Sequence, residues 1–169
     1  MICTYMSTPG HSDFRPSTLL LRIVDFKRAA RCYVAEVSDG SVTGFHHLAL
    51  TVRDLDASTS WYEQLFDLDP VIDEPGDERR AKVYRLRGTA QLLGLVEHRG
   101  NDGSGFRPDR TGLDHAAFSV ATRADVDAWA QRLDAAGIDH SGRIDIALGA
   151  ILNFADPDGI ALSIFYEGD

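Results

Sequence analysis

The chain has 169 residues, of which 44% are hydrophobic and 25% charged, and a formal charge of −9 at pH 7. This composition fits one globular domain and excludes a chain that is disordered, collagen-like or coiled-coil throughout. The negative charge argues against a nucleic-acid partner, because binding to phosphates is driven by Lys and Arg side chains that release counterions. No apolar run approaches the ~20 residues that cross a bilayer. We therefore expect no contact with membranes and a cytoplasmic location.

Residues 1–43 differ from the rest of the chain. They mix turn-forming residues, one short apolar run and a basic patch, and they end in a polar stretch. We interpret this segment as a partly disordered N-terminal extension, although a translation start assigned too far upstream would also explain it. Cys3 and Cys32 both lie here, so a disulfide between them would leave the main body without a cross-link, and we expect a reducing environment.

An internal repeat organises the rest of the chain. Residues 44–52 align with residues 112–120 and share Gly, His, Ala and Val in register; without a gap, Trp61 then falls on Trp129. Agreement at this many positions indicates a duplicated unit. The expected boundaries are 44–167 for the domain, about 44–100 for the first module and about 112–167 for the second.

The sequence of the first module predicts a strand, a helix and three further strands. Residues 45–52 alternate between apolar and other side chains, which is the period of a half-buried strand. Acidic residues then start an amphipathic helix, in which Leu55, Trp61 and Leu65 recur at helical spacing and Trp61 anchors the core. The strand candidates that follow are residues 70–72, 81–86 and 91–97.

The second module repeats this plan. A strand is expected at 113–120 and a helix at 124–136, closed by Gly137, with Trp129 as the core anchor. The later strands are expected at residues 138–143, 148–154 and 160–166. Before the last of them, the sequence Asp-Pro-Asp-Gly at 156–159 is typical of a tight hairpin turn. The pattern predicts an α+β fold built from two tandem βαβββ modules.

The first strand of each module carries small side chains on one face. If its leucines and valine pack against the helix, the remaining side chains point the other way. These residues are His47, Ala49 and Thr51 in the first module and His115, Ala117 and Ser119 in the second. Apart from the histidines they are small and leave volume for a ligand. A tightly packed sheet face with two hydrogen-bonded histidines is the alternative, but the equivalent placement of both histidines favours a shared site.

Three features point to a known family. They are the paired first strands, the run from Val52 to Ser58 that leads into Trp61 and Tyr62, and the turn at 156–159 followed by a strand. Together they resemble the vicinal oxygen chelate superfamily, which includes glyoxalase I, extradiol dioxygenases, fosfomycin-resistance enzymes and bleomycin-binding proteins. The resemblance, which covers the whole domain, implies that the modules curl into a cupped mixed sheet with helices on the outer face. It also implies a homodimer.

The resemblance further implies a divalent-metal site on the open face of the sheet. By position, the ligands from the first strands would be His47 and His115. The carboxylate position on the last strand holds Ser163 instead, and its counterpart in the first module holds Gly94. Two neutral imidazoles without a carboxylate leave a divalent cation under-coordinated. We therefore expect Fe, Mn, Ni or Zn to be held weakly or not at all.

The same face is expected to bind a small-molecule ligand. Its lining would consist of Ala49, Thr51, Gly94, Ala117, Ser119, Ser163 and Phe165. We predict a glyoxalase- or bleomycin-resistance-like binding protein, or a metal-independent enzyme, with a degenerate metal site and no assigned catalytic residue. One alternative is a metal-dependent lyase, isomerase or dioxygenase acting on vicinal oxygens, with ligands shifted to Glu167 and His98. Another is a regulatory module with a vestigial pocket. Residues 98–105 would connect the modules and form a rim of the pocket.

Overall fold

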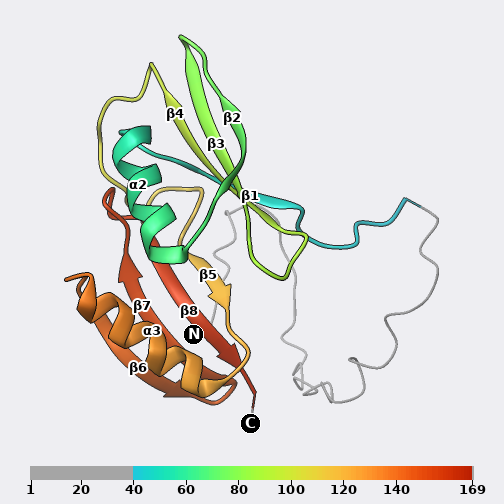
Figure 1. The fold of residues 1–169 in the computed structure, drawn as a ribbon, viewed down its shortest axis with the longest axis vertical. Coiled ribbons are helices and arrows are strands. Elements are labelled where there is room, and N and C mark those ends of the chain that lie inside the picture. Colours follow the sequence, from blue (N-terminus) through green and yellow to red (C-terminus); the bar gives the residue numbers. More distant parts are fainter. Residues whose placement is uncertain (1–39, 169) are drawn as a thin grey trace, which may run out of the picture. The chain divides into compact units, whose positions relative to one another are not determined.

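The computed structural model describes residues 40–168 (Figure 1). Gly44–Asp169 forms one compact unit. The predictions for the extension before residue 40, and for Cys3 and Cys32, lie outside the described residues. Within the described part of the chain, no helix is both long enough and apolar enough to span a membrane.

The first module contains the predicted elements in the predicted order. Strand β1 covers His47–Thr51 and helix α2 covers Leu55–Phe66. The remaining strands are β2 at Pro70–Glu74, β3 at Arg79–Arg85 and β4 at Leu92–His98. They form a sheet in the order β1-β4-β3-β2, in which β1 runs parallel to β4 and the other neighbours are antiparallel. β1 is therefore an edge strand of this sheet.

The second module has the same order of elements. Strand β5 covers Ala116–Ser119 and helix α3 covers Arg123–Ala135. The remaining strands are β6 at His140–Ile146, β7 at Gly149–Ala155 and β8 at Ala161–Glu167. The sheet order is β5-β8-β7-β6, with β5 parallel to β8. β5 is shorter than the predicted strand at 113–120, and His115 lies just before its first residue.

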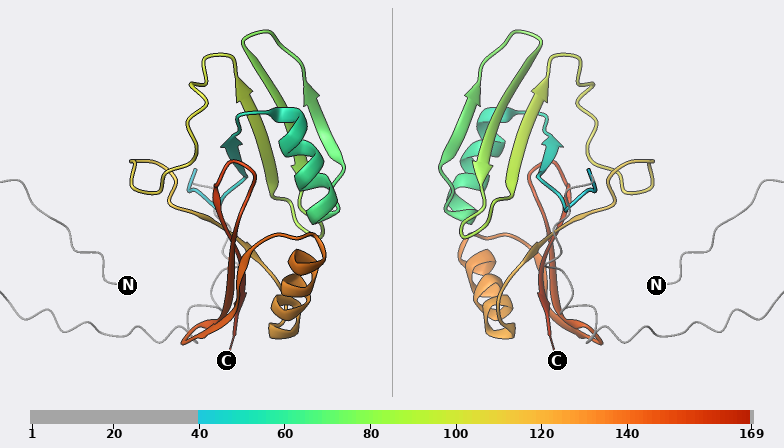
Figure 2. Two further views of the ribbon diagram at one scale, coloured as in Figure 1. Left: turned by 90° about the vertical axis from the view of Figure 1, so that its left-hand side faces the viewer. Right: turned by 90° about the vertical axis from the view of Figure 1, so that its right-hand side faces the viewer.

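The α+β class and the two βαβββ modules are confirmed, and each module has its own four-stranded sheet. β1 and β5 each end their own sheet, and the two sheets are separate. Figure 2 shows the green helix α2 above the orange helix α3. The ring centroids of Phe66 in α2 and Trp129 in α3 lie 5.0 Å apart. The helices therefore meet at the boundary between the modules, which we call the seam.

Side chains at the helix ends explain where the helices begin. Asp54 caps α2 by accepting a hydrogen bond from an amide of the first turn at 3.0 Å. Glu97 of β4 accepts another from the Leu55 amide at 2.8 Å. At α3, Thr122 and Asp125 form a reciprocal capping box. These contacts satisfy amides that the first helical turn leaves without an intrahelical partner.

The hydrophobic core contains residues of both modules. Leu50 in β1 and Val52 just after it are 2% and 0% exposed, as their alternation predicts. Leu48 is 36% exposed, because it stands near the start of the edge strand and lines a hollow between the modules. Trp61 and Trp129, the predicted core anchors, are partly buried against the core. Because one cluster of buried side chains spans the seam, the modules fold as a single body.

A polar cluster, which we call the clasp (Arg53, Tyr62, Asp156 and Asp158), ties the modules together at one corner. Arg53, after β1, donates from its amide and from Nε to the two carboxylate oxygens of Asp158, both at 2.7 Å. The Tyr62 hydroxyl of α2 donates to Asp156 Oδ2 at 3.0 Å. The second oxygen of Asp156 accepts the amides of Asp158 and Ile160. The turn before β8 is thus fixed to α2 and to the segment that precedes this helix.

Candidate functional site

Strand register places the predicted residues of the first module on one face of its sheet. Ala49 pairs with Gly94 and Thr51 with Val96, and residues paired across neighbouring strands point to the same side. Gly94 allows close packing, because a β-carbon built there would lie 3.4 Å from the β-carbon of Ala49. The space that the glycine leaves is therefore partly taken by Ala49.

The second module places its predicted residues on the equivalent face. Ala117 pairs with Ser163, and Ser119 with Phe165. Ser163, at the predicted carboxylate position, is 3% exposed, and its hydroxyl donates to Asn153 Oδ1 at 2.8 Å. This contact satisfies a buried hydroxyl within the sheet. Ser163 is thus engaged with a neighbouring strand.

His47 and His115 line one hollow of about 370 Å³, which we call the histidine hollow. Its other walls are mainly apolar and come from β1, β4 and β5, with Leu48, Leu92 and Phe118 among them. Both imidazoles are exposed, because each lies at or next to the start of an edge strand. The repeat predicted that these histidines would share a site, and the structure brings both to the same hollow.

The donor set around these histidines does not fit a divalent metal. His47 Nδ1 lies 3.1 Å from His46 Nδ1, and His115 Nδ1 lies 2.6 Å from Asp114 Oδ1. Within residues 40–168, no three His, Cys, Asp or Glu side chains gather closely enough to hold a metal ion. Protein sites for Zn²⁺ and Fe²⁺ need at least three protein ligands, usually with a carboxylate or thiolate among them. Two imidazoles alone do not meet this need.

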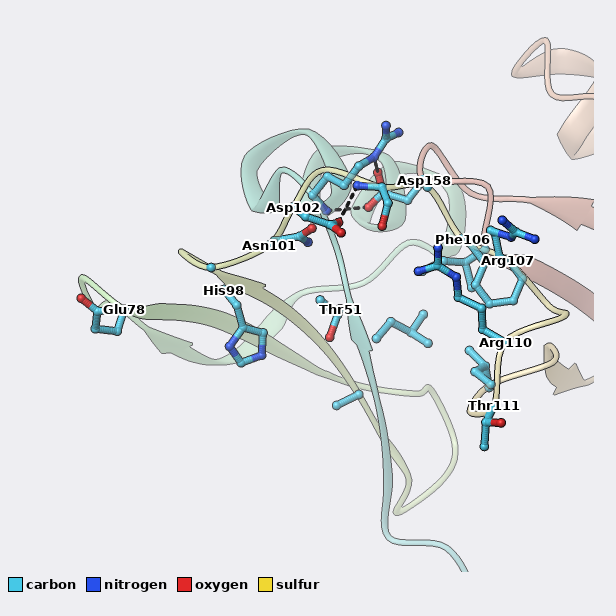
Figure 3. Close-up of a pocket in the computed structure, with 18 residues that line it drawn as sticks. Thr51, Glu78, His98, Asn101, Asp102, Phe106, Arg107, Arg110, Thr111 and Asp158 are labelled. Carbon is cyan, nitrogen blue, oxygen red and sulfur yellow. Dashed lines mark hydrogen bonds and ion pairs between the residues drawn. The ribbon is translucent and has the colours of Figure 1, made fainter.

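A larger hollow of about 930 Å³ lies over the open face of the first sheet (Figure 3). We call it the connector hollow, because the residues that join the modules form much of its wall. In Figure 3, Thr51 stands between His98 of β4 on one side and Phe106 and Arg110 of the connector on the other. Glu167, the alternative partner of His98 in a shifted metal site, lies at the end of β8 in the other module.

Hydrogen bonds fix the connector to both modules. The Asn101 side chain donates to the Val52 carbonyl at 3.3 Å. The Phe106 amide donates to the Asp158 carbonyl at 3.1 Å, and the Phe106 ring is partly buried against the core. The stretch that the sequence suggested as a rim is therefore a wall anchored at β1 and at the clasp.

Two local contacts shift the pKa values of charged side chains in the connector. Arg107 forms a two-point ion pair with Asp109, which raises the pKa of the guanidinium and lowers the pKa of the carboxyl. Hydrogen bonds from Ser104 lower the pKa of Asp102, with a smaller contribution from the charge of Arg110. Arg110 has no carboxylate within ion-pair distance among residues 40–168, so its guanidinium can donate hydrogen bonds to a ligand.

The predicted site residues are divided among different hollows. Ala49 and Thr51 line the connector hollow, whereas His47, His115 and Ala117 line the histidine hollow. Ala117 also lines a further hollow, together with Ser119. Those predicted residues that line a hollow are thus distributed over several concavities within one chain.

Phe106 and Thr111 shape the connector hollow and gave no signal in the sequence, whereas Asn101 lay in the stretch suggested as a rim. Asp158 drew notice only as part of a turn, and its partner Arg53 stands 105 positions away, beyond any local pattern. The glycine-rich composition around Asn101 indicated a connector but not its hydrogen bond to β1.

These features define a class of protein in which two βαβββ modules place ligand-sized hollows beside their first strands. Residues 44–164 match the family model described as the Glyoxalase/Bleomycin resistance protein/Dioxygenase superfamily. The chain belongs to this superfamily, which confirms the resemblance seen in its sequence.

Solved structures extend the comparison. A glyoxylase/bleomycin resistance protein/dioxygenase domain from Frankia sp. EAN1pec is 36% identical, and the match covers 76% of this chain and 100% of that one at a TM-score of 0.71. TnmS3, an antibiotic binding protein from Streptomyces sp. CB03234, is 23% identical over 76% of this chain and 98% of its own, at a TM-score of 0.58. The fosfomycin resistance protein FosX from Listeria monocytogenes is 20% identical over 76% and 94%, at 0.56. The last two share the fold. No curated protein matches the chain significantly.

Proposed function

We propose that this protein binds a small organic molecule in the connector hollow and does so without a tightly held metal ion. The observation that carries the proposal is the hollow of about 930 Å³ over Ala49 and Thr51, walled by a connector that is hydrogen-bonded in place. Ligand sites typically have volumes of roughly 300–1,000 Å³. Phe106 supplies apolar surface, and Thr51 and Asn101 supply polar groups, so the hollow suits a molecule with both kinds of surface.

The chemistry of the remaining donors supports binding without a metal. Gly94 and Ser163 stand where carboxylates would be expected, and Ser163 is already hydrogen-bonded. Among proteins of the same fold, TnmS3 is described as antibiotic binding. The second candidate is a metal-dependent lyase, isomerase or dioxygenase. It is favoured by the shared hollow of His47 and His115 and by a FosX variant crystallised with Mn(II).

Metal analysis separates these two candidates. Protein purified without a metal-affinity tag is expected to contain far less than equimolar metal, and to bind added Fe(II), Mn(II), Ni(II) or Zn(II) weakly. Ser163→Glu is expected to bind these ions more tightly, because it supplies a carboxylate at the position where the superfamily resemblance expects one. Equimolar metal in the wild type, lost in both His47→Ala and His115→Ala, would contradict the proposal and favour the metal-dependent enzyme.

Filling the connector hollow tests its role in binding. The probe is 1-anilinonaphthalene-8-sulfonate, whose fluorescence rises in apolar sites. Thr51→Leu adds a larger side chain to the floor of the hollow and is expected to weaken probe binding at least tenfold. Ser60→Leu, on the exposed side of α2, adds the same apolar group outside the hollow and is the matched control. Unchanged binding by Thr51→Leu would contradict the assignment of the hollow.

We also propose that the protein forms a homodimer in the cytoplasm. The observations in support are the edge positions of β1 and β5 and the exposure of Ile72, Ile144 and Ile146, at 50%, 42% and 40%. Open edges and apolar patches of this kind are typical of surfaces that another chain covers. A monomeric mass by light scattering would contradict the dimer, and cell fractionation tests the location.

A further inference from the structure

A third hollow, of about 310 Å³, lies at the seam. The clasp holds one corner of the seam, and this hollow lies at the corner that corresponds to it in the internal repeat. Its walls come from the end of α2, from the turn between β3 and β4, from β5 and from α3. We call it the aromatic hollow, after the rings of Phe66, Phe118 and Trp129 that line it. None of the site residues predicted in the first module contributes to it.

The three rings form one cluster and remain partly open. The Phe66 ring centroid lies 4.8 Å from that of Phe118 and 5.0 Å from that of Trp129. All three side chains are only partly buried against the core. Rings at these distances and tilts favour further edge-to-face or offset contacts with another aromatic ring.

The sequence explains why this corner stays open. The repeat aligns Arg53 with Ala121 and Tyr62 with Ala130, so the second module lacks both clasp donors. The turn between β3 and β4, at residues 86–91, contains no carboxylate that could play the part of Asp156 or Asp158. Paired polar groups fill the corner that holds the clasp, and the equivalent corner has no such pairs and contains the hollow.

Polar groups at the hollow limit the kind of ligand that fits. Gln91 and Ser119 line it, and the side chain of each can both donate and accept hydrogen bonds. Among the described residues that line the hollow, the one cation is Arg87, which is paired with the Asp67 carboxylate at 2.9 Å and the Asp67 carbonyl at 3.0 Å. Arg132 lies outside this lining and stacks over the Trp129 ring, 5.2 Å from its centroid. The described lining also contains no carboxylate, so it offers a charged ligand no unpaired opposite charge to offset the loss of water.

We propose that the aromatic hollow is a second binding site, which takes a flat, uncharged aromatic or heteroaromatic molecule. The three rings contact the face and edge of the ligand, and Gln91 or Ser119 hydrogen-bonds a polar substituent. A volume of about 310 Å³ stands at the lower end of the range for ligand sites, which suits a molecule of two or three rings. This site is independent of the connector hollow and of the function proposed for it.

The test uses 1-N-phenylnaphthylamine, a neutral two-ring probe, and tryptophan fluorescence. Trp61 and Trp129 are the only tryptophans, so the Trp61→Phe variant leaves Trp129 as the single reporter. In this background the probe is expected to bind saturably and to quench Trp129. Two further substitutions each fill the hollow and are each expected to weaken binding at least tenfold. Ser119→Phe is added to this background. Thr89→Trp is made separately, with the fluorescence of the probe as the readout. Thr51→Leu, which fills the connector hollow, is the matched control and is expected to bind the probe as before.

Three outcomes overturn the proposal. The first is undiminished binding in both filled variants that melt as the parent does. The second is loss of binding in Thr51→Leu, which places the probe in the connector hollow. The third is a dimer by light scattering that dissociates in Ser119→Phe, because a second copy would then cover the aromatic hollow. Failure of this test does not affect the role proposed for the connector hollow, which is tested by its own experiment.

Discussion

The two corners of the seam are built from equivalent segments of a duplicated unit, yet they differ in kind. At one corner, Arg53 and Tyr62 hold the turn before β8 through Asp158 and Asp156. At the other, alanines replace both donors, and an open hollow lined by aromatic rings remains. One paired corner and a shared core are enough to hold the modules together. The duplicated units have thus diverged, with polar contacts at one corner and the hollow proposed as a binding site at the other.

The clasp has an inner layer, the hydrogen bond between Tyr62 and Asp156, and an outer layer, the ion pair between Arg53 and Asp158. The two layers differ in burial and so in their expected contributions to the free energy of unfolding. Asp156 is 6% exposed, and burial raises the pKa of Tyr62, which keeps its hydroxyl protonated as a donor. The Arg53 side chain is 43% exposed, which weakens its ion pair with Asp158 through solvent screening. Substitutions at the inner layer are thus expected to have larger effects than those at the outer layer.

Removal of the inner carboxylate is expected to have the largest effect. Asp156→Ala leaves the Tyr62 hydroxyl and the amides of Asp158 and Ile160 without their acceptor. Each unsatisfied buried donor costs about 1–3 kcal/mol, so we expect a loss of at least about 3 kcal/mol in the free energy of unfolding. Urea denaturation measures it. Asp109→Ala, at an exposed ion pair, is the control and is expected to unfold at the wild-type midpoint.

The pH dependence of stability tests the same carboxyl. Burial raises the pKa of Asp156 above its ordinary value of 3.8, although hydrogen bonds from Ile160, Tyr62 and Asp158 oppose the rise. The native state therefore holds this proton more tightly than the unfolded chain does. The resulting contribution to the unfolding free energy is fully present below pH 3.8 and is lost as the pH rises through the native pKa.

Asp156→Asn cannot titrate, so its stability relative to wild type is expected to increase as the pH rises from below 4. Tyr62→Phe removes a donor that stabilises the carboxylate, and the loss with rising pH should be larger in that variant. Urea unfolding at a series of pH values measures both differences. A constant difference between wild type and Asp156→Asn would show that Asp156 titrates alike in the two states.

The outer layer is expected to have a smaller effect. Arg53→Ala removes the side-chain ion pair with Asp158 and a hydrogen bond to the Pro157 carbonyl, while the backbone amide of residue 53 keeps its own bond to Asp158. We expect a loss of about 1 kcal/mol in the free energy of unfolding. A loss equal to that of Asp156→Ala would mean that the two layers act as one cooperative network, which a double-mutant cycle would quantify.

The smallest effect is expected where the clasp has no counterpart. Ala121→Arg places a guanidinium at the position equivalent to Arg53, but the turn at 86–91 has no acid to receive it. The free energy of unfolding is expected to change by less than about 0.5 kcal/mol. A clear gain in stability would show that the open corner can be closed by one donor, and would remove the distinction between the corners.

Local patterns in the sequence predicted the fold, because each element depends on its own residues. The alternation at residues 45–52 predicted the buried Leu50 and Val52, and the resemblance placed Gly94 and Ser163 at equivalent positions, where both are paired with alanines of the first strands. The exposure of Leu48 was not evident, since alternation does not reveal which strand lies at an edge.

The site was harder to predict than the fold, because it depends on contacts between distant segments. Small side chains suggested open volume, but Gly94 instead allows β1 to pack closely, and Ser163 bonds to the neighbouring strand. The bond between Tyr62 and Asp156 joins residues 94 positions apart. Only the folded chain shows that the connector, rather than the sheet alone, shapes the larger hollow.

The parallel pairing of the first and last strands of each module has a consequence for folding. β2, β3 and β4 pair through short turns, whereas His47 of β1 pairs with Leu92 of β4 across a long loop that contains a helix and two strands. Closing the longer loop carries the larger entropic cost, and β5 meets β8 under the same constraint. The strands that place the two histidines are therefore expected to join the native structure last and to exchange their amide hydrogens first.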